Sequence, residues 1–327
     1  DAAAAAAARH LGTLDVFELL FRLGARDFRS IGHKAIYVAN SFRTLGAIGR
    51  QHAEPIVRSL CYALLNYEGS TSPDKGDLAP DRPGRRNAEW VKKFRSDWRD
   101  GKLDDAATSD MLAALRTGSE EECSAKVIEL VNRGVAPQSI WDALLVGAGE
   151  MLVRQPGIVG LHTLTSTNAL RFAYDTTASD ETRRFLLLQN AAFLPLFREA
   201  QKGRGPVGDT RLDQLAAAEV KAEENEKARL EKIFHDVSAD RMAAARGVLA
   251  YLAQGGDAKQ LVDTARVLTF LKGRDSHDYK FSSAVLEDYA NVSPNWRNRF
   301  LAASVFNLRG SGGEDNSLVV RTRAALG

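Results

Sequence analysis

The sequence has few cysteines, little net charge and no long apolar run, and each shortage excludes a class of protein. Its 327 residues include two cysteines, Cys61 and Cys123, which are too few for a disulfide framework. The formal net charge is +2, without a block of lysines or arginines, so no binding of nucleic acid is expected. No apolar segment reaches the roughly 20 residues that cross a bilayer, so no membrane span is expected.

Several catalytic and metal-binding motifs are absent as well. The chain contains no His-Glu-x-x-His, no Cys-x-x-Cys and no Glu-x-x-His, which argues against a zincin, a zinc ribbon and a di-iron carboxylate bundle. It also lacks the phosphate-binding P-loop, the glycine-rich dinucleotide fingerprint and the Gly-x-Ser-x-Gly elbow of hydrolases. No nucleotide cofactor is therefore expected.

The beginning of the chain gives no targeting information. It starts at Asp1 and continues with seven alanines, so we expect the true N-terminus to be missing, together with any signal it carries. The cellular location stays unknown, with the cytoplasm slightly favoured. The sequence does not give the oligomeric state.

Apolar residues recur at helical spacing along nearly every long segment, whereas strict alternation of apolar and polar residues is almost absent. This periodicity predicts an all-α fold. Turn-rich segments at Ser70–Arg86 and Gln201–Gly208 interrupt the helices. Two charged helices are expected between the packed units, over Asn87–Arg99 and Leu212–Phe234.

Three segments share one pattern of helices, which indicates an internal repeat. In each segment a histidine opens a helix directly after a break, at His33, His162 and His277. An amphipathic helix that carries an arginine follows at a similar spacing in all three. We interpret the chain as a single all-helical domain, 1–327, built from three degenerate helical pseudo-repeats. The approximate copies are 1–68, 119–200 and 238–310, with a loop or insert at 69–118 and a loop and charged helix at 201–237.

The repeat histidines are the main candidates for a functional site. If three equivalent helices pack around one axis, the side chains of His33, His162 and His277 face the same interior point. Imidazole is the commonest protein ligand of iron, zinc and copper, and facing helices are a known way to build such a site. His52 and His235 lie at predicted helix ends and are two further candidate metal ligands. One histidine taken alone is more often structural or exposed, so the argument rests on the matching positions.

Lys280 lies three residues after His277 and therefore on the same helix face. A site of imidazoles alone would leave the charge of the metal uncompensated in a helical interior, which is costly. Lys280 is therefore a candidate ligand in a neutral or carboxylated form. The alternative is that Lys280 pairs with Glu287 or Asp278 at the surface.

A second matched pattern follows the histidines. Asn40-x-x-Arg43 and Asn168-x-x-Arg171 each place an amide and a guanidinium on one helix face, and Glu287 occupies the corresponding part of the third copy. These residues are candidates for holding the metal ligands in place. A polar seam that only packs the repeats together is the alternative interpretation.

Two of these stretches resemble a known family. Gly-His-x-x-Ile-Tyr, beginning at Gly32, and Leu-His-x-x-Thr-x-x-x-Ala-Leu-Arg at Leu161–Arg171 occur in an all-helical chain with scattered histidines. In these features the chain resembles the questin-oxidase-like family, whose members open anthraquinone-type rings with O2. The resemblance implies a mononuclear non-haem iron held by histidines and a carboxylated lysine. It implies no particular substrate for this chain.

The sequence thus predicts a histidine-liganded mononuclear iron (Fe2+) oxidase or oxygenase that acts on an apolar small molecule, aromatic ones included. Two other classes stay open. One is a non-enzymatic helical-repeat interaction protein, in which the histidines only reflect the repeat and a concave face binds a partner. The other is a haem-binding protein, because two opposed histidines can bind haem.

Overall fold

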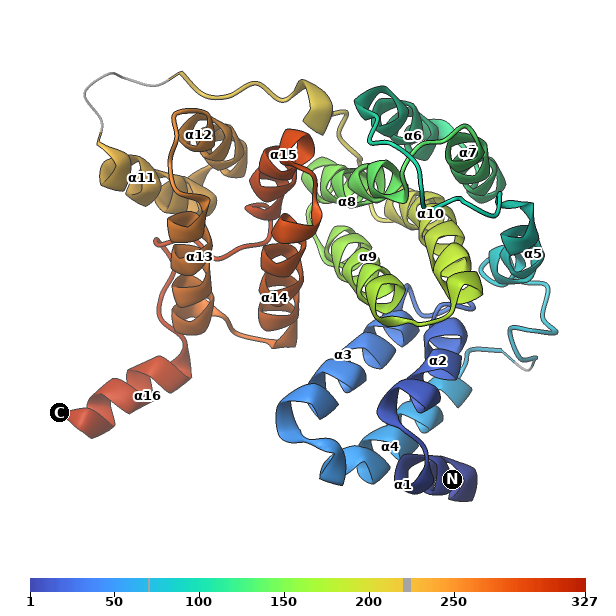
Figure 1. Cartoon of the computed structure of the whole chain (residues 1–327). Helices are drawn as coiled ribbons and strands as arrows, with labels where there is room; N and C mark the ends of the chain where they lie inside the picture. Colours follow the sequence, from blue (N-terminus) through green and yellow to red (C-terminus); the bar gives the residue numbers. More distant parts are fainter. Residues whose placement is uncertain (70, 220–224) are drawn as a thin grey trace. The chain divides into compact units, whose positions relative to one another are not determined.

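The computed structural model describes residues 1–69, 71–219 and 225–327 (Figure 1). These residues form sixteen α-helices and three short 3-10 helices, and no β-strand occurs among them. The prediction of an all-α fold is confirmed. The packing of three pseudo-repeats stays a prediction.

The chain forms two compact units, and each is assembled from segments that are distant in the sequence. The first unit consists of Asp1–Gly147 and Ser166–Gly205, and the second consists of Ala148–Thr165 and Pro206–Gly327. The boundary passes through two helices, α8 (Pro137–Arg154) and α9 (Ile158–Thr176). Each of these helices therefore contributes residues to both units.

The first unit contains eight further α-helices and two 3-10 helices among its described residues. They are α1 (Ala2–His10), α2 (Thr13–Gly24), α3 (His33–Ile48), η1 (Arg50–His52), α4 (Ala53–Leu65), α5 (Arg82–Trp90), η2 (Val91–Lys93), α6 (Asp105–Thr117), α7 (Glu120–Asn132) and α10 (Asp180–Lys202). Helix α10 lies at the centre, because α2, α5, α6 and α7 all pack against it. Its middle section is buried on all sides, which explains why apolar residues there do not follow a single helix face.

The second unit adds six α-helices and one 3-10 helix from its described residues. They are η3 (Leu212–Gln214), α11 (Glu226–Ala239), α12 (Arg241–Ala253), α13 (Ala258–Lys272), α14 (Ser276–Asn291), α15 (Pro294–Ser304) and α16 (Ser317–Leu326). Helix α15 packs against α12 and α14, and α13 packs against α14. The end of α8 joins them through Gly149, where an added Cβ would lie 3.0 Å from the Cβ of Ala303.

The helix predicted over Asn87–Arg99 is wrong for its second half. Helix α5 ends at Trp90, and only the short η2 follows it. The side chain of Asn132 accepts a hydrogen bond from the backbone N–H of Arg95 at 2.9 Å and donates one to the backbone oxygen of Lys93 at 2.9 Å. A tertiary contact therefore satisfies the backbone groups that a continuing helix would have paired.

The helix predicted over Leu212–Phe234 is wrong for residues 215–219, which are not helical, and its part at 220–224 lies outside the described residues. The backbone N–H of Ala218 donates to the carbonyl oxygen of Arg246 on α12 at 3.0 Å. Packing against another helix thus replaces a hydrogen bond inside the segment. Among the described residues, no helix combines the length and the apolar character needed to cross a membrane.

Candidate functional site

His162 belongs to the part of α9 that lies in the second unit, and it is only 1% exposed. Its Nδ1 lies 2.7 Å from the carbonyl oxygen of Ile158, one helical turn earlier. A carbonyl oxygen can only accept, so this nitrogen carries a proton, and in the neutral ring Nε2 is the atom with the lone pair. A histidine ring held in this way presents Nε2 as a metal ligand.

The Nε2 atom of His162 lies 3.2 Å from the Nζ atom of Lys280 on α14. Lys280 is half-buried. Its withdrawal from water lowers the pKa of its amine, and the negative charge of Asp275 opposes this shift only in part. Lys280 therefore gives up its proton more easily than a lysine in water does.

His277 is the third member of this cluster. Its ring centroid lies 5.6 Å from that of His162, with 71° between the ring planes. Its Nδ1 lies 3.5 Å from Oδ1 of Asp275, and the same oxygen accepts the backbone N–H of His277 at 2.7 Å. Asp275 thus caps the start of α14 and lies beside the His277 ring.

Asp278 follows His277 in the sequence but has a different partner. Its carboxylate binds the guanidinium of Arg309 at 2.6 to 3.0 Å and accepts the backbone N–H of Arg274 at 2.7 Å. The negative charge of Asp278 is therefore paired with Arg309 rather than with Lys280.

The spacing of the cluster can be compared with the needs of a metal ion. Two nitrogen ligands about 2.1 Å from one ion, at an angle of about 90 to 110°, lie about 3.0 to 3.4 Å apart. The 3.2 Å between His162 and Lys280 falls within this range. In the part of the chain that the structure describes, no group of three or more His, Cys, Asp or Glu residues could hold a metal ion. The cluster fits a metal only if Lys280 is a ligand.

His33 is the first residue of α3 in the first unit and is half-buried. Its ring stacks on Tyr37, with 5.8 Å between the centroids. Gly32 before it has a φ of 78°, and an added Cβ would lie 2.1 Å from Oγ of Ser166, so only glycine fits here. The convergence of His33 with the other two repeat histidines stays a prediction.

The two remaining candidate histidines lie on the surface of their units. His52 is exposed at the end of η1 in the first unit. The side chain of His235, on α11 in the second unit, is 70% exposed, and its Nδ1 lies 3.3 Å from Oδ1 of Asp236. Neither environment resembles that of His162.

The structure brings together three of the five polar residues that were predicted to support the site. Arg43 donates to the side-chain oxygen of Asn40 at 3.3 Å and to that of Asn168 at 3.2 Å, and its guanidinium lies 4.0 Å from the centroid of the Phe172 ring. These contacts lie in the first unit. They link α3 to α9 across the predicted repeats.

The other two residues have separate surroundings. Arg171 lies in the first unit, where it donates to Asp175 at 2.7 Å and to the side-chain oxygen of Gln138 at 3.1 Å. It also lies over the ring of Trp141. Glu287 is an exposed residue of α14 in the second unit.

Sequence reasoning missed Asp275 and Arg309. Asp275 could have been found, because an aspartate directly before a helix is a typical N-cap. The pairing of Arg309 with Asp278 could not have been found in this way, because it joins segments that no local pattern relates.

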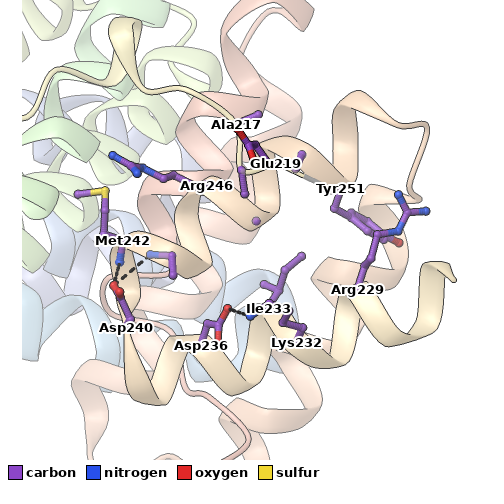
Figure 2. Close-up of a pocket in the computed structure, with 14 residues that line it drawn as sticks. Ala217, Glu219, Arg229, Lys232, Ile233, Asp236, Asp240, Met242, Arg246 and Tyr251 are labelled. Carbon is purple, nitrogen blue, oxygen red and sulfur yellow. Dashed lines mark hydrogen bonds and ion pairs between the residues drawn. The ribbon is translucent and has the colours of Figure 1, made fainter. Parts of the chain in front are cut away.

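A cavity of about 600 Å³ lies between α11 and α12 in the second unit (Figure 2). None of the predicted site residues lines it. Lys232 in its wall pairs with Asp236 at 2.8 Å, and Asp240 accepts the backbone N–H groups of Met242 and Ala243 at the start of α12. Lys232 and Asp236 thus pair within α11, and Asp240 caps α12.

Comparison with known proteins gives no relative for this chain. No protein-family model, no curated protein and no solved structure matches it.

Proposed function

We propose that the cluster of His162, His277 and Lys280 binds iron and supports an O2-dependent oxidation of an apolar small molecule. The observation that carries this proposal is the 3.2 Å contact between Nε2 of a buried, oriented histidine and the amine of Lys280. A lysine with a purely structural role normally pairs with a carboxylate or extends into water. Lys280 instead faces the lone pair of an imidazole.

Lys280 acts in a neutral form, either as the amine itself or after carboxylation. In the carboxylation step the amine nitrogen forms a bond to the carbon of CO2 and releases one proton, which leaves an anionic carbamate. A lysine with a lowered pKa favours this step, because only the neutral amine has a free electron pair. The carbamate adds the negative charge that imidazoles do not supply, and the resemblance to the questin-oxidase-like family implies the same modification.

The protein residues in this proposal orient the ligands. The carbonyl of Ile158 keeps the proton of His162 on Nδ1, and Asp275 lies beside the Nδ1 of His277. Iron held by these residues would supply redox chemistry toward O2 and an electron-rich substrate.

The test is the metal content of the full chain after loading with Fe2+ and removal of unbound metal. We expect about one iron per chain in the wild type, and a loss of affinity of about 10-fold or more in His162→Gln and Lys280→Ala. His235→Gln is the matched control, because it removes an exposed imidazole from the same unit. Oxygen consumption with apolar aromatic compounds then tests for oxidation.

Other results would contradict the proposal. A wild-type chain that takes up no iron favours the helical-repeat interaction protein, and a Soret band in the purified protein favours haem binding. Equal iron retention by Lys280→Ala and the wild type excludes Lys280 as a ligand. Urea denaturation of the metal-free variants separates a lost ligand from a lost fold.

A further inference from the structure

A second cavity of about 630 Å³ in the second unit is lined mainly by cationic side chains and by a glycine-rich loop. It lies between the end of α11, the end of α13 and the segment after α15. Its described lining residues with charge are Arg241, Lys272, Arg274, Arg309 and Glu314. None of the three residues of the proposed iron site, His162, His277 and Lys280, lines it.

Two of the four cations are held in place by carboxylates. Nζ of Lys272 lies 3.1 Å from Asp315, and the guanidinium of Arg309 binds Asp278 with both oxygens 2.6 Å away. The side chains of Asp278 and Asp315 are largely buried. The positions of these two cations are therefore set before any ligand arrives.

The other two cations are uncommitted. Within the described part of the chain, the side chains of Arg241 and Arg274 have no carboxylate partner and no hydrogen bond. Glu314, the acidic residue of the lining, likewise pairs with neither of them. The unpaired groups of the lining, two guanidiniums and one carboxylate, therefore carry a net positive charge.

The glycine-rich loop closes one side of the cavity. A Cβ added at Gly310 would lie 2.3 Å from Oγ of Ser238, so the loop can approach α11 this closely only without a side chain. The backbone N–H of Ser311 donates to the carbonyl oxygen of Phe234 at 2.9 Å, and that of Gly312 donates to Ser238 at 3.1 Å. The loop is fixed against the helix and adds no bulky side chain to the cavity.

We propose that this cavity binds a small phosphate-bearing ligand. Guanidinium groups offer paired N–H donors that match phosphate oxygens, and each charge-assisted bond is stronger than a neutral one. The volume lies within the range of about 300 to 1,000 Å³ for small-molecule sites. Two free guanidiniums beside two held cations suit a compact dianion, whereas the chain as a whole has too little positive charge for a polyanion.

Isothermal titration calorimetry of the full chain with inorganic phosphate tests the site. We expect saturable binding to one site, a loss of affinity of about 10-fold or more in Arg241→Gln and in Arg274→Gln, and tighter binding in Glu314→Gln. Arg321→Gln on α16 is the matched control, because that exposed arginine has no partner among the described residues and is not part of the cavity lining. Its affinity should equal that of the wild type.

Three results would overturn the proposal. The first is that sodium chloride of equal ionic strength gives the same heat as phosphate. The second is that both arginine variants bind phosphate as tightly as the wild type. The third is that acetate binds as tightly as phosphate. The iron proposal can fail without affecting this one, because Lys280→Ala should bind phosphate normally. Circular dichroism of each variant tests whether the substitution leaves the fold intact.

Discussion

Two lysines that lie close to repeat histidines in the sequence have opposite surroundings. Lys34, directly after His33, is 2% exposed, and its Nζ lies 3.1 Å from the fully buried carboxylate of Asp27. Lys280, three residues after His277, faces an imidazole instead of a carboxylate. The partner therefore decides whether the amine is a structural charge or a candidate ligand.

The pair of Lys34 and Asp27 gives a prediction for single residues. Asp27→Asn keeps the shape of the side chain but leaves the ammonium of Lys34 buried beside a neutral group. We expect the free energy of unfolding to fall by about 3 to 5 kcal/mol in urea denaturation. Glu181→Gln, which breaks an exposed pair with Arg22, should cost at most about 1 kcal/mol. Equal losses in the two variants would contradict a structural role of the buried pair.

At the scale of helices, one hydroxyl joins three elements of the second unit. The hydroxyl of Tyr251 on α12 donates to the carboxylate of Glu226, the first residue of α11, at 2.8 Å. Glu226 also accepts the backbone N–H of Asp257, which caps α13, at 3.0 Å. Burial and the hydrogen bond to Glu226 raise the pKa of Tyr251 from 10.0 to about 12.

This junction predicts a dependence of stability on pH. The unfolded chain loses the phenol proton near pH 10, whereas the folded protein keeps it up to about pH 12. The folded state thus binds more protons in this window, and the stabilisation by Tyr251 is present below pH 10 and is lost as the pH rises towards 12. Tyr251→Phe should lower the free energy of unfolding at pH 7 by about 1.5 to 3 kcal/mol.

Urea denaturation of both proteins at several pH values checks this prediction. The difference in stability between the wild type and Tyr251→Phe should shrink between pH 10 and 12. Tyr62→Phe is the control, because Tyr62 is 75% exposed and its loss should change little at any pH. A difference that stays constant through the window would show that the hydroxyl does not titrate as stated.

At the scale of the whole molecule, neither unit is one continuous segment. The second unit needs Ala148–Thr165, which carries His162 and the close contact of Gly149 with Ala303. The same segment supplies Glu150, whose carboxylate accepts the backbone N–H of Leu212 at 3.0 Å. Cutting the chain at residue 205 therefore removes part of the second unit.

A fragment that contains only Pro206–Gly327 should not fold as the second unit does in the full chain. It lacks the packing surface of Ala148–Thr165. Leu212, which is fully buried in the full chain, would therefore lose packing contacts in the fragment. We expect loss of cooperative unfolding in circular dichroism and no retention of Fe2+. The full chain measured in parallel is the control, and a fragment that unfolds cooperatively would contradict the prediction.

The features that the sequence alone determined are those that arise from neighbouring residues. Apolar periodicity predicts the helices. The reciprocal hydrogen bonds of Ser119 and Glu122 with each other's backbone at the start of α7 are an equally local feature, found in the structure. The placement of His277 and Lys280 on one face of α14 follows from helical spacing alone. These interactions span at most one helical turn, so a linear pattern records them.

The remaining features depend on contacts between residues that are distant in the sequence. His162 and Lys280 are 118 positions apart, and nothing in the sequence relates Asp278 to Arg309. The non-helical path of residues 215–219, inside the helix predicted over Leu212–Phe234, likewise includes a backbone bond from Ala218 to Arg246 on α12. Helix packing selects such pairs by burial and by the satisfaction of polar groups across the whole fold, and local periodicity carries no information about either.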